Sequence, residues 1–280
     1  MLNIGDFNEL KVVRKASFGY YLDRGTKKSS DDILLPNGNT EGKEVNIGDV
    51  VNAFIYRDSR DRLIATLKTP LAILGDVAYL EVTQITNFGA FVNFGLERDI
   101  LIPLREQKYK LEEGRKYLVY IYLDKTGRLA ATTDVDKYLD EMEDVKLMSD
   151  IDGVVYGYQT NGSLRVAIDN KYRAVVLKNE YFTKIFPGDV VKGKIKRVYE
   201  DGIIGLSLRQ YKLKEKDDLE KRILKYLKEN GGEMIYNDKS SPDDIKRQFK
   251  TSKNYFKMAL GGLMKKNLIE QGNFGTKLKE

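Results

Sequence analysis

The sequence predicts a multi-domain, mainly β protein, with three small five-stranded antiparallel barrels in series followed by an α+β winged helix-turn-helix domain. Two observations predict this fold. A pattern of alternating strands and Gly-rich turns recurs at a spacing of about 66–70 residues. Towards the C-terminus the hydrophobic period then changes from 2 to 3.6 residues. At 280 residues the chain is long enough for several domains of ordinary size.

The first two units match in letters as well as in pattern. The stretch "NIGDFNELKVVRKASFGYYLD" from residue 3 is echoed by "ILGDVAYLEVTQITNFGAFVN" from residue 73, and "DILLP" by "DILIP". Each copy has a Gly-Asp start, an alternating strand, an aromatic-Gly turn and a second strand. We therefore expect two copies of one barrel, at residues 1–69 and 70–134.

A third unit, expected at residues 150–212, repeats the same order more faintly. It contains "SDIDGVVYGYQTNGSLRVAID", "AVVL" and "PGDVVKGKIKRVY". Gly162 stands where the first two units have Phe18 and Phe88. The strand pattern survives while the aromatic residue is lost, which predicts a degenerate third barrel.

The stretch between the second and third units, residues 135–149, is strongly acidic and is predicted to form a linker helix. Its apolar residues fall at helical spacing: Tyr138, Leu139, Met142 and Val145.

The last segment, residues 213–280, has the pattern of a winged helix domain. A first helix is expected at about 217–229, a second at 240–249 and a third at 252–272, followed by a short hairpin. Ser241 is placed as the N-cap of the second helix, with Pro242 at its first helical position. The third helix is expected to turn four residues inward: Phe256, Leu260, Leu263 and Met264.

The composition excludes many kinds of catalysis. The chain has no Cys and no His, which rules out disulfides, thiolate or imidazole metal sites and a histidine base. Neither a phosphate-binding glycine loop nor a Ser-x-x-Lys motif occurs. We therefore expect no enzyme activity, no cofactor and no metal. No apolar run is long enough to span a bilayer, so the sequence predicts a cytoplasmic protein that does not bind membranes. We also expect a monomer.

The orientation of the rings in "NFGAFVNFG" decides between core and binding surface. In a regular strand Phe88 and Phe91 would face opposite sides, because they are three residues apart. A bulge at Gly89 would let both rings face outward. Burial of both rings in the core is the alternative, since phenylalanine is usually buried. The residues expected to point into the barrel are Ala90, Val92 and Phe94.

The first two units resemble the ribosomal-protein S-one type RNA-binding domain, an OB-fold barrel. The resemblance rests on "ITNFGAFVNFG", "DILIPL" and "YLVYIYLDKTGRLAATT". It implies that the stacking aromatics are Phe88 and Phe91 in the second unit, and Phe18 and Tyr21 in the first. It also implies polar RNA contacts at Asp124 and Arg128, and at Asp58 and Arg62. The usual histidine of the family falls near Ile102 and Leu35, so that contact is missing.

The order of modules resembles the conserved virulence factor B family of bacterial RNA-binding regulators over essentially the whole chain. This resemblance implies a role in regulating virulence-type gene expression.

Two further basic strips could hold nucleic acid. The formal net charge of +6 (Lys+Arg 48, Asp+Glu 42) is compatible with a polyanionic partner. In the third unit the candidates are Lys192, Lys194, Lys196 and Arg197; a solvated strand face is the alternative. In the winged helix domain they are Lys253, Asn254 and Lys257 on the third helix, and Lys277 on the wing. Packing of that domain on the third barrel is the alternative there.

The sequence therefore predicts a protein that captures single-stranded RNA by stacking and charge, and so changes RNA turnover or gene expression. One alternative is a DNA-binding transcription regulator that uses its winged helix. Another is a ribosome-associated adaptor whose barrels bind protein.

Overall fold

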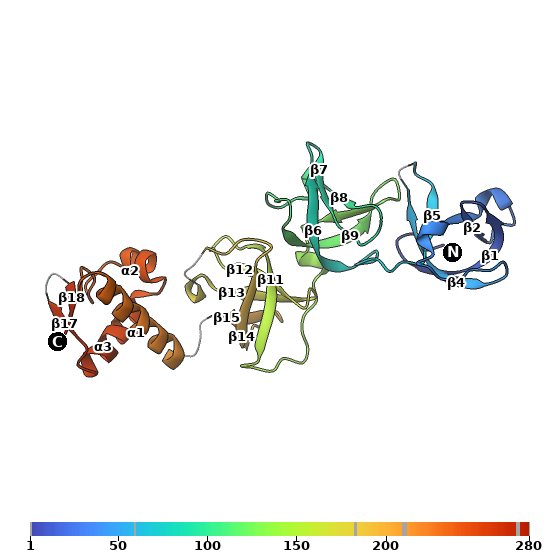
Figure 1. The fold of residues 1–280 in the computed structure, drawn as a ribbon. Coiled ribbons are helices and arrows are strands. Elements are labelled where there is room, and N and C mark those ends of the chain that lie inside the picture. The colour runs from blue at the N-terminus through green and yellow to red at the C-terminus, as the bar shows by residue number, and fades with distance from the viewer. Residues whose placement is uncertain (1, 59, 182–183, 209–211, 273–274, 280) are drawn as a thin grey trace.

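Four units follow one another along an elongated molecule in the computed structural model, with the two termini at opposite ends (Figure 1). The structure describes residues 2–58, 60–181, 184–208, 212–272 and 275–279. Three closed barrels occupy the first 207 residues, and a helical domain with a small sheet follows.

Each barrel has five strands joined in the same order. The strands of the first barrel are β1 (Phe7–Ala16), β2 (Gly19–Leu22), β3 (Ile33–Pro36), β4 (Val50–Arg57) and β5 (Leu63–Thr66). Strand β4 pairs back onto β1, which closes the ring β1-β2-β3-β5-β4, and the contact between β3 and β5 is parallel.

Short 3-10 turns lie between strands and after the second barrel, at Ser29–Asp31, Asn37–Asn39, Leu104–Glu106, Asp136–Tyr138 and Lys178–Glu180.

The second and third barrels repeat this topology, which confirms the predicted series of three five-stranded barrels. The second contains β6 (Val77–Ile85), β7 (Gly89–Val92), β8 (Ile100–Pro103), β9 (Lys116–Leu123) and β10 (Leu129–Thr132). The third contains β11 (Asp150–Tyr158), β12 (Leu164–Ile168), β13 (Tyr172–Val176), β14 (Val190–Val198) and β15 (Ile204–Ser207).

Gly89 allows two strands to approach closely, and the bulge predicted there lies elsewhere. The register shift is in β6, between Val82 and Gln84. A Cβ atom on Gly89 would lie 2.4 Å from the carbonyl oxygen of Ile102 in β8. The prediction was wrong about the bulge because a strand glycine also marks close backbone approach, and the sequence does not distinguish the two cases.

Neighbouring barrels share apolar contacts. Phe54 of β4 belongs to the same buried cluster as the core of the second barrel, and its ring centroid lies 5.9 Å from that of Phe94. Between the second and third barrels, Arg115 pairs with Asp189 at 2.7 Å. The buried cluster at that second junction consists of Leu118, Val135, Leu139, Val154, Tyr156 and Ala167.

The acidic linker is not the predicted helix. Its only helical part is the three-residue 3-10 turn Asp136–Tyr138. The apolar residues pack in two directions instead: Leu139 enters the junction between the barrels, whereas Met142 and Val145 pack on the core of the third barrel. A short acidic segment gains little from forming a helix alone, so packing against two barrels determines its path.

The C-terminal domain contains three helices and a three-stranded sheet. The helices are α1 (Lys212–Glu229), α2 (Pro242–Phe249) and α3 (Lys253–Lys265), and the strands are β16 (Glu233–Met234), β17 (Ile269–Gly272) and β18 (Gly275–Leu278). Ser241 caps α2 as predicted, because its side chain accepts a hydrogen bond from the backbone N–H of Asp244.

The details of this domain differ from the sequence-based expectations in the bounds of two helices, in the size of the sheet and in the exposure of Met264. The first helix begins at Lys212 rather than near residue 217, and the third ends at Lys265. The small sheet gains β16, which pairs with β18. Met264 is 42% exposed, while Phe256, Leu260 and Leu263 are buried as expected. Met264 directly follows Leu263, and adjacent helical residues point in different directions.

We expect Gly89→Ala to destabilise the second barrel by about 1–3 kcal/mol, since the new methyl group would meet backbone atoms of β8 that cannot move aside cheaply. Urea unfolding measures this change. Gly157→Ala is the matched control, because no atom lies within 4 Å of a Cβ at that strand position. Equal stability changes in the two variants would contradict the close-approach explanation.

Candidate nucleic-acid interface

Phe88 and Phe91 form a pair of rings on the outside of the second barrel. Phe88 lies in the turn before β7 and is 55% exposed, whereas Phe91 lies in β7 and is half-buried. Their centroids are 6.0 Å apart at an angle of 88°. The residues that alternate with Phe91 point into the core as expected: Ala90, Val92 and Phe94. Phe88 reaches the outer side because it stands outside the strand, where the alternation of the strand no longer applies.

The first barrel repeats this arrangement with one change. Phe18 is 56% exposed, and its ring centroid lies 6.3 Å from that of Tyr21 at 76°. The guanidinium of Arg14 covers the Tyr21 ring at 3.8 Å. The residue paired with Phe91 at the corresponding strand position is the uncharged Gln84. The first barrel therefore presents one open ring and one ring that already carries a cation.

The third barrel has a different surface at this point. A Cβ on Gly162 would lie 3.4 Å from the side chain of Lys178, which occupies the space beside the turn. The Tyr181 hydroxyl donates to the Gly162 carbonyl oxygen, and Lys178 donates to that hydroxyl at 3.1 Å. The loss of the aromatic residue seen in the sequence is thus accompanied by a polar contact at the same place.

A groove of about 390 Å³ lies between the first two barrels and includes the ring pair. Its rings include Phe88, Phe91 and Tyr122. Four arginines line it, and they come from both barrels: Arg57, Arg98, Arg105 and Arg128. Stacking rings next to guanidinium groups are the features by which OB-fold barrels bind single strands.

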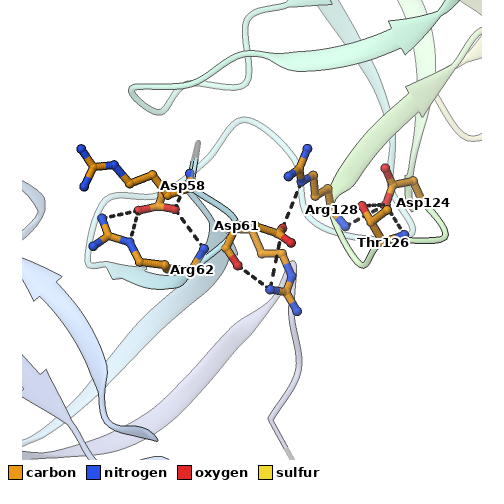
Figure 2. A network of polar contacts seen from close by, with 8 residues as sticks. Asp58, Asp61, Arg62, Asp124, Thr126 and Arg128 are labelled. Atoms are coloured by element: carbon orange, nitrogen blue, oxygen red, sulfur yellow. Dashed lines mark hydrogen bonds and ion pairs between the residues drawn. The ribbon is translucent and has the colours of Figure 1, made fainter. Parts of the chain in front are cut away.

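The two predicted Asp–Arg pairs behave differently (Figure 2). In the first barrel Asp58 accepts hydrogen bonds from Nε and a terminal nitrogen of Arg62, at 3.0 and 2.7 Å. In the second barrel Asp124 accepts from the Thr126 hydroxyl at 2.7 Å and from the backbone N–H of Arg128. The Arg128 guanidinium turns away from Asp124 and pairs with another residue. The predicted pair at Asp124 and Arg128 therefore exists only through the backbone.

The hydrogen bonds in these turns keep both aspartates charged. Burial by itself would raise the pKa of Asp58, but the hydrogen bonds from Arg62 and from backbone N–H groups outweigh it and lower the pKa. Burial likewise opposes the hydrogen bonds at Asp124, whose pKa is also lowered, chiefly by Thr126 and Arg128. The side chains of Asp58 and Asp124 are therefore negatively charged at neutral pH.

The lysine strip of β14 is largely neutralised, contrary to its reading as an open basic strip. Lys192, Lys194 and Lys196 alternate outward as predicted, but each pairs with an acid. Those acids are Asp152, Asp150 and Glu180, at 3.5, 2.6 and 2.8 Å. The pairing depends on strand neighbours that were not apparent from the sequence.

The bulge after Ile195 breaks the regular alternation of β14 before Arg197, whose guanidinium lies 5.7 Å from the Tyr199 ring.

Of the four residues predicted as contacts in the winged helix domain, two are exposed and two make contacts within the protein. Asn254 and Lys257 are exposed on α3, while Lys253 donates to the carbonyl oxygen of Lys239 at 3.4 Å. Lys277 pairs with Glu233 at 2.8 Å, and the hydrogen bond that it donates to that carboxylate raises the pKa of Lys277.

A second basic cleft, of about 540 Å³, lies between the third barrel and α2. Sequence reasoning did not select the residues that line it. Tyr158 and Phe186 are 46% and 49% exposed there. The cations are Lys178, Lys184, Lys246, Arg247 and Lys250, with Asp243 as the acid.

The sequence analysis also missed Arg57, Arg98 and Arg105 of the inter-barrel groove. Arg98 and Arg105 flank "DILIPL", the segment in which the family histidine is missing, so proximity to that motif was an available signal. Arg57 comes from the other barrel, and no local pattern could indicate it.

The described part of the chain holds no group of three or more acidic side chains placed to bind a metal ion. Within the same residues, none of the helices is both long and apolar enough to cross a membrane.

Comparison with known proteins agrees with this architecture. The S1 domain model matches residues 4–68 and 74–134, and the CvfB-like winged helix domain model matches residues 221–278. The YitL protein of Bacillus subtilis is 32% identical over 95% of this chain and 91% of its own length. Conserved virulence factor B of Staphylococcus epidermidis (strain ATCC 12228) is 30% identical over 82% of this chain and 80% of its own length. The chain belongs to the conserved virulence factor B family.

A solved structure has the same overall fold. It is a multidomain protein with nucleic acid binding domains from Streptococcus pneumoniae, 25% identical, with a TM-score of 0.54 over 99% of this chain and 98% of that one. Members of this family thus join two domain types, OB-fold barrels and a winged helix, that bind nucleic acids in other proteins.

Phe88→Ala is expected to change the stability of the second barrel by less than about 1 kcal/mol, because the ring is exposed and little apolar contact is lost. Phe94→Ala is the matched control and should cost about 3–5 kcal/mol, since Phe94 is 2% exposed within the core. Chemical denaturation of both variants tests the assignment. Similar losses in the two would show that Phe88 is a core residue.

Proposed function

We propose that this protein is a non-catalytic RNA-binding regulator that captures single-stranded RNA in the groove between its first two barrels. The observation that carries this proposal is the exposed ring pair Phe88 and Phe91 beside the arginines of that groove. Unpaired bases can stack on such rings, at about 1–3 kcal/mol per base, while guanidinium groups hold the phosphates.

The geometry favours a single strand over a duplex at this site. Stacking on a side chain needs a base with a free face, which bases inside a duplex do not offer. The rings lie at nearly right angles to each other, so one base could stack on each ring only if the strand turned between them. A similar pair recurs at Phe18 and Tyr21, where the open ring of Phe18 supplies a second stacking position on the first barrel.

A regulatory role is supported by the names of the relatives, several of which are called conserved virulence factor B. The mechanism that fits a chain of binding barrels is occupancy: the protein changes RNA turnover or the expression of target genes by covering an RNA segment.

DNA binding through the winged helix is the second candidate function. Asn254 and Lys257 are exposed on α3, the helix that enters the major groove in related domains. Against it, Lys277 on the wing is already paired with Glu233.

Competition binding separates the two functions. A labelled pyrimidine-rich RNA of about 16 nucleotides is bound to the full chain, and unlabelled RNA or duplex DNA is added. We expect the RNA to displace the label at much lower concentration than the duplex. Equal displacement by duplex DNA at the same concentration would refute the RNA proposal.

The variant Phe88→Ala/Phe91→Ala should weaken binding of this RNA by about tenfold or more, because two stacking platforms are lost. Its matched control is Tyr138→Ala, which removes an aromatic ring that stacks on Tyr120; neither of these two tyrosines lines the groove. Circular dichroism confirms that both variants are folded. Unchanged affinity in the double variant would contradict stacking at this site.

A further inference from the structure

The turn between the last two strands has the same backbone hydrogen bond in all three barrels, but the first barrel differs from the other two at the fourth position. In each turn the fourth residue donates its backbone N–H to the first: Asp61 to Asp58, Gly127 to Asp124, and Gly202 to Tyr199. The fourth residue is left-handed in every copy, with φ of 65°, 75° and 73°. Glycine adopts this conformation without steric cost, and aspartate is one of the few other residues that tolerate it. The first barrel therefore has a carboxylate where the other two have no side chain.

That carboxylate lies between two arginines at the junction of the first and second barrels (Figure 2). Nε of Arg128 donates to Oδ1 of Asp61 at 3.0 Å, across the junction. A terminal nitrogen of Arg57 lies 3.8 Å from the same oxygen and donates to the Asp61 carbonyl oxygen at 2.6 Å. Both arginines line the groove that contains the ring pair.

Arg57 retains hydrogen-bonding capacity beyond this contact. Nε of Arg57 is buried and has no hydrogen-bond partner, and it lies beside Gly127, where a Cβ would be 3.5 Å away. A buried guanidinium donor without an acceptor is unfavourable in the free protein. An anion with several acceptor oxygens would satisfy two guanidinium groups better than one carboxylate oxygen does.

We propose that Arg57 and Arg128 form a binding subsite for a backbone phosphate of the RNA, which Asp61 fills in the free protein. The inference rests on the proposed function of the adjacent ring pair and deepens it. Asp61 competes with the phosphate for Arg128 and thereby lowers the affinity for RNA. The pair is about half exposed, so it contributes little to stability and can be exchanged for a phosphate at low cost.

The same exchange couples RNA capture to the arrangement of the barrels. Asp61 belongs to the first barrel and Arg128 to the second, so a phosphate that takes Arg128 also removes a contact between them. Phe54 and Phe94 continue to join the two barrels through the apolar cluster.

The test measures the affinity of the full chain for the same pyrimidine-rich RNA. Asp61→Asn should bind about two- to fivefold more tightly, because a competing ion pair of exposed side chains is lost. Asp61→Gly should raise RNA affinity in the same way as Asp61→Asn. It installs the residue found in the other two turns and is compatible with the left-handed conformation at this position. Glu44→Gln is the matched control: it removes one charge from an exposed position of the first barrel outside the groove.

A double-mutant cycle identifies the arginine involved. Arg128→Gln alone should weaken binding, and in that background Asp61→Asn should have a clearly smaller effect than in the parent chain. Two outcomes overturn the subsite. In one, Asp61→Asn changes RNA affinity no more than Glu44→Gln does. In the other, Asp61→Asn changes RNA affinity equally in the parent chain and in the Arg128→Gln background. Either result with normal RNA binding by the parent chain leaves the proposed function standing. Failure of the parent chain to bind RNA overturns both.

Discussion

Closure of the five-stranded barrel is the constraint on which the rest of this structure depends. Each strand must turn alternate residues into a small interior, and β4, β9 and β14 must pair back onto the first strand of their barrels. At Gly89 the backbone of β7 approaches the Ile102 carbonyl so closely that a side chain has no room. The apolar residues of β7 fill the interior, and Phe88, one step before the strand, remains outside.

Contacts between the first two barrels create a surface to which both barrels contribute residues. A groove forms between the first two barrels, where Arg57 and Asp58 at the end of β4 line the same pocket as the ring pair of the second barrel. The apolar contact of Phe54 with Phe94 and the ion pair of Asp61 with Arg128 both act at this junction. The apolar contact is buried, whereas the ion pair is about half exposed and contributes little to stability. Under the proposed phosphate subsite, binding in the groove would break the ion pair and leave the apolar contact in place.

The acidic and basic residues show where local patterns mislead. The linker was predicted as a helix from apolar spacing, but Leu139 and Met142 pack against different neighbours and the segment follows the barrel surfaces. Lys192 and Lys194 alternate outward as the strand period requires, yet acids on the adjacent β11 neutralise them. In both cases tertiary partners that the local pattern does not contain decided the outcome.

The sequence by itself determined the barrels, their order, the winged helix domain and its Ser241 cap, because these depend on periodicity and on residues close together in the chain. It also located the ring pairs, since the aromatic-Gly motif is local. Only the tertiary structure decided which charges are available. The partner of Arg128 is Asp61, 67 positions away in another barrel. No period or short motif encodes such a pair, because it exists only once two separately folded barrels have come together.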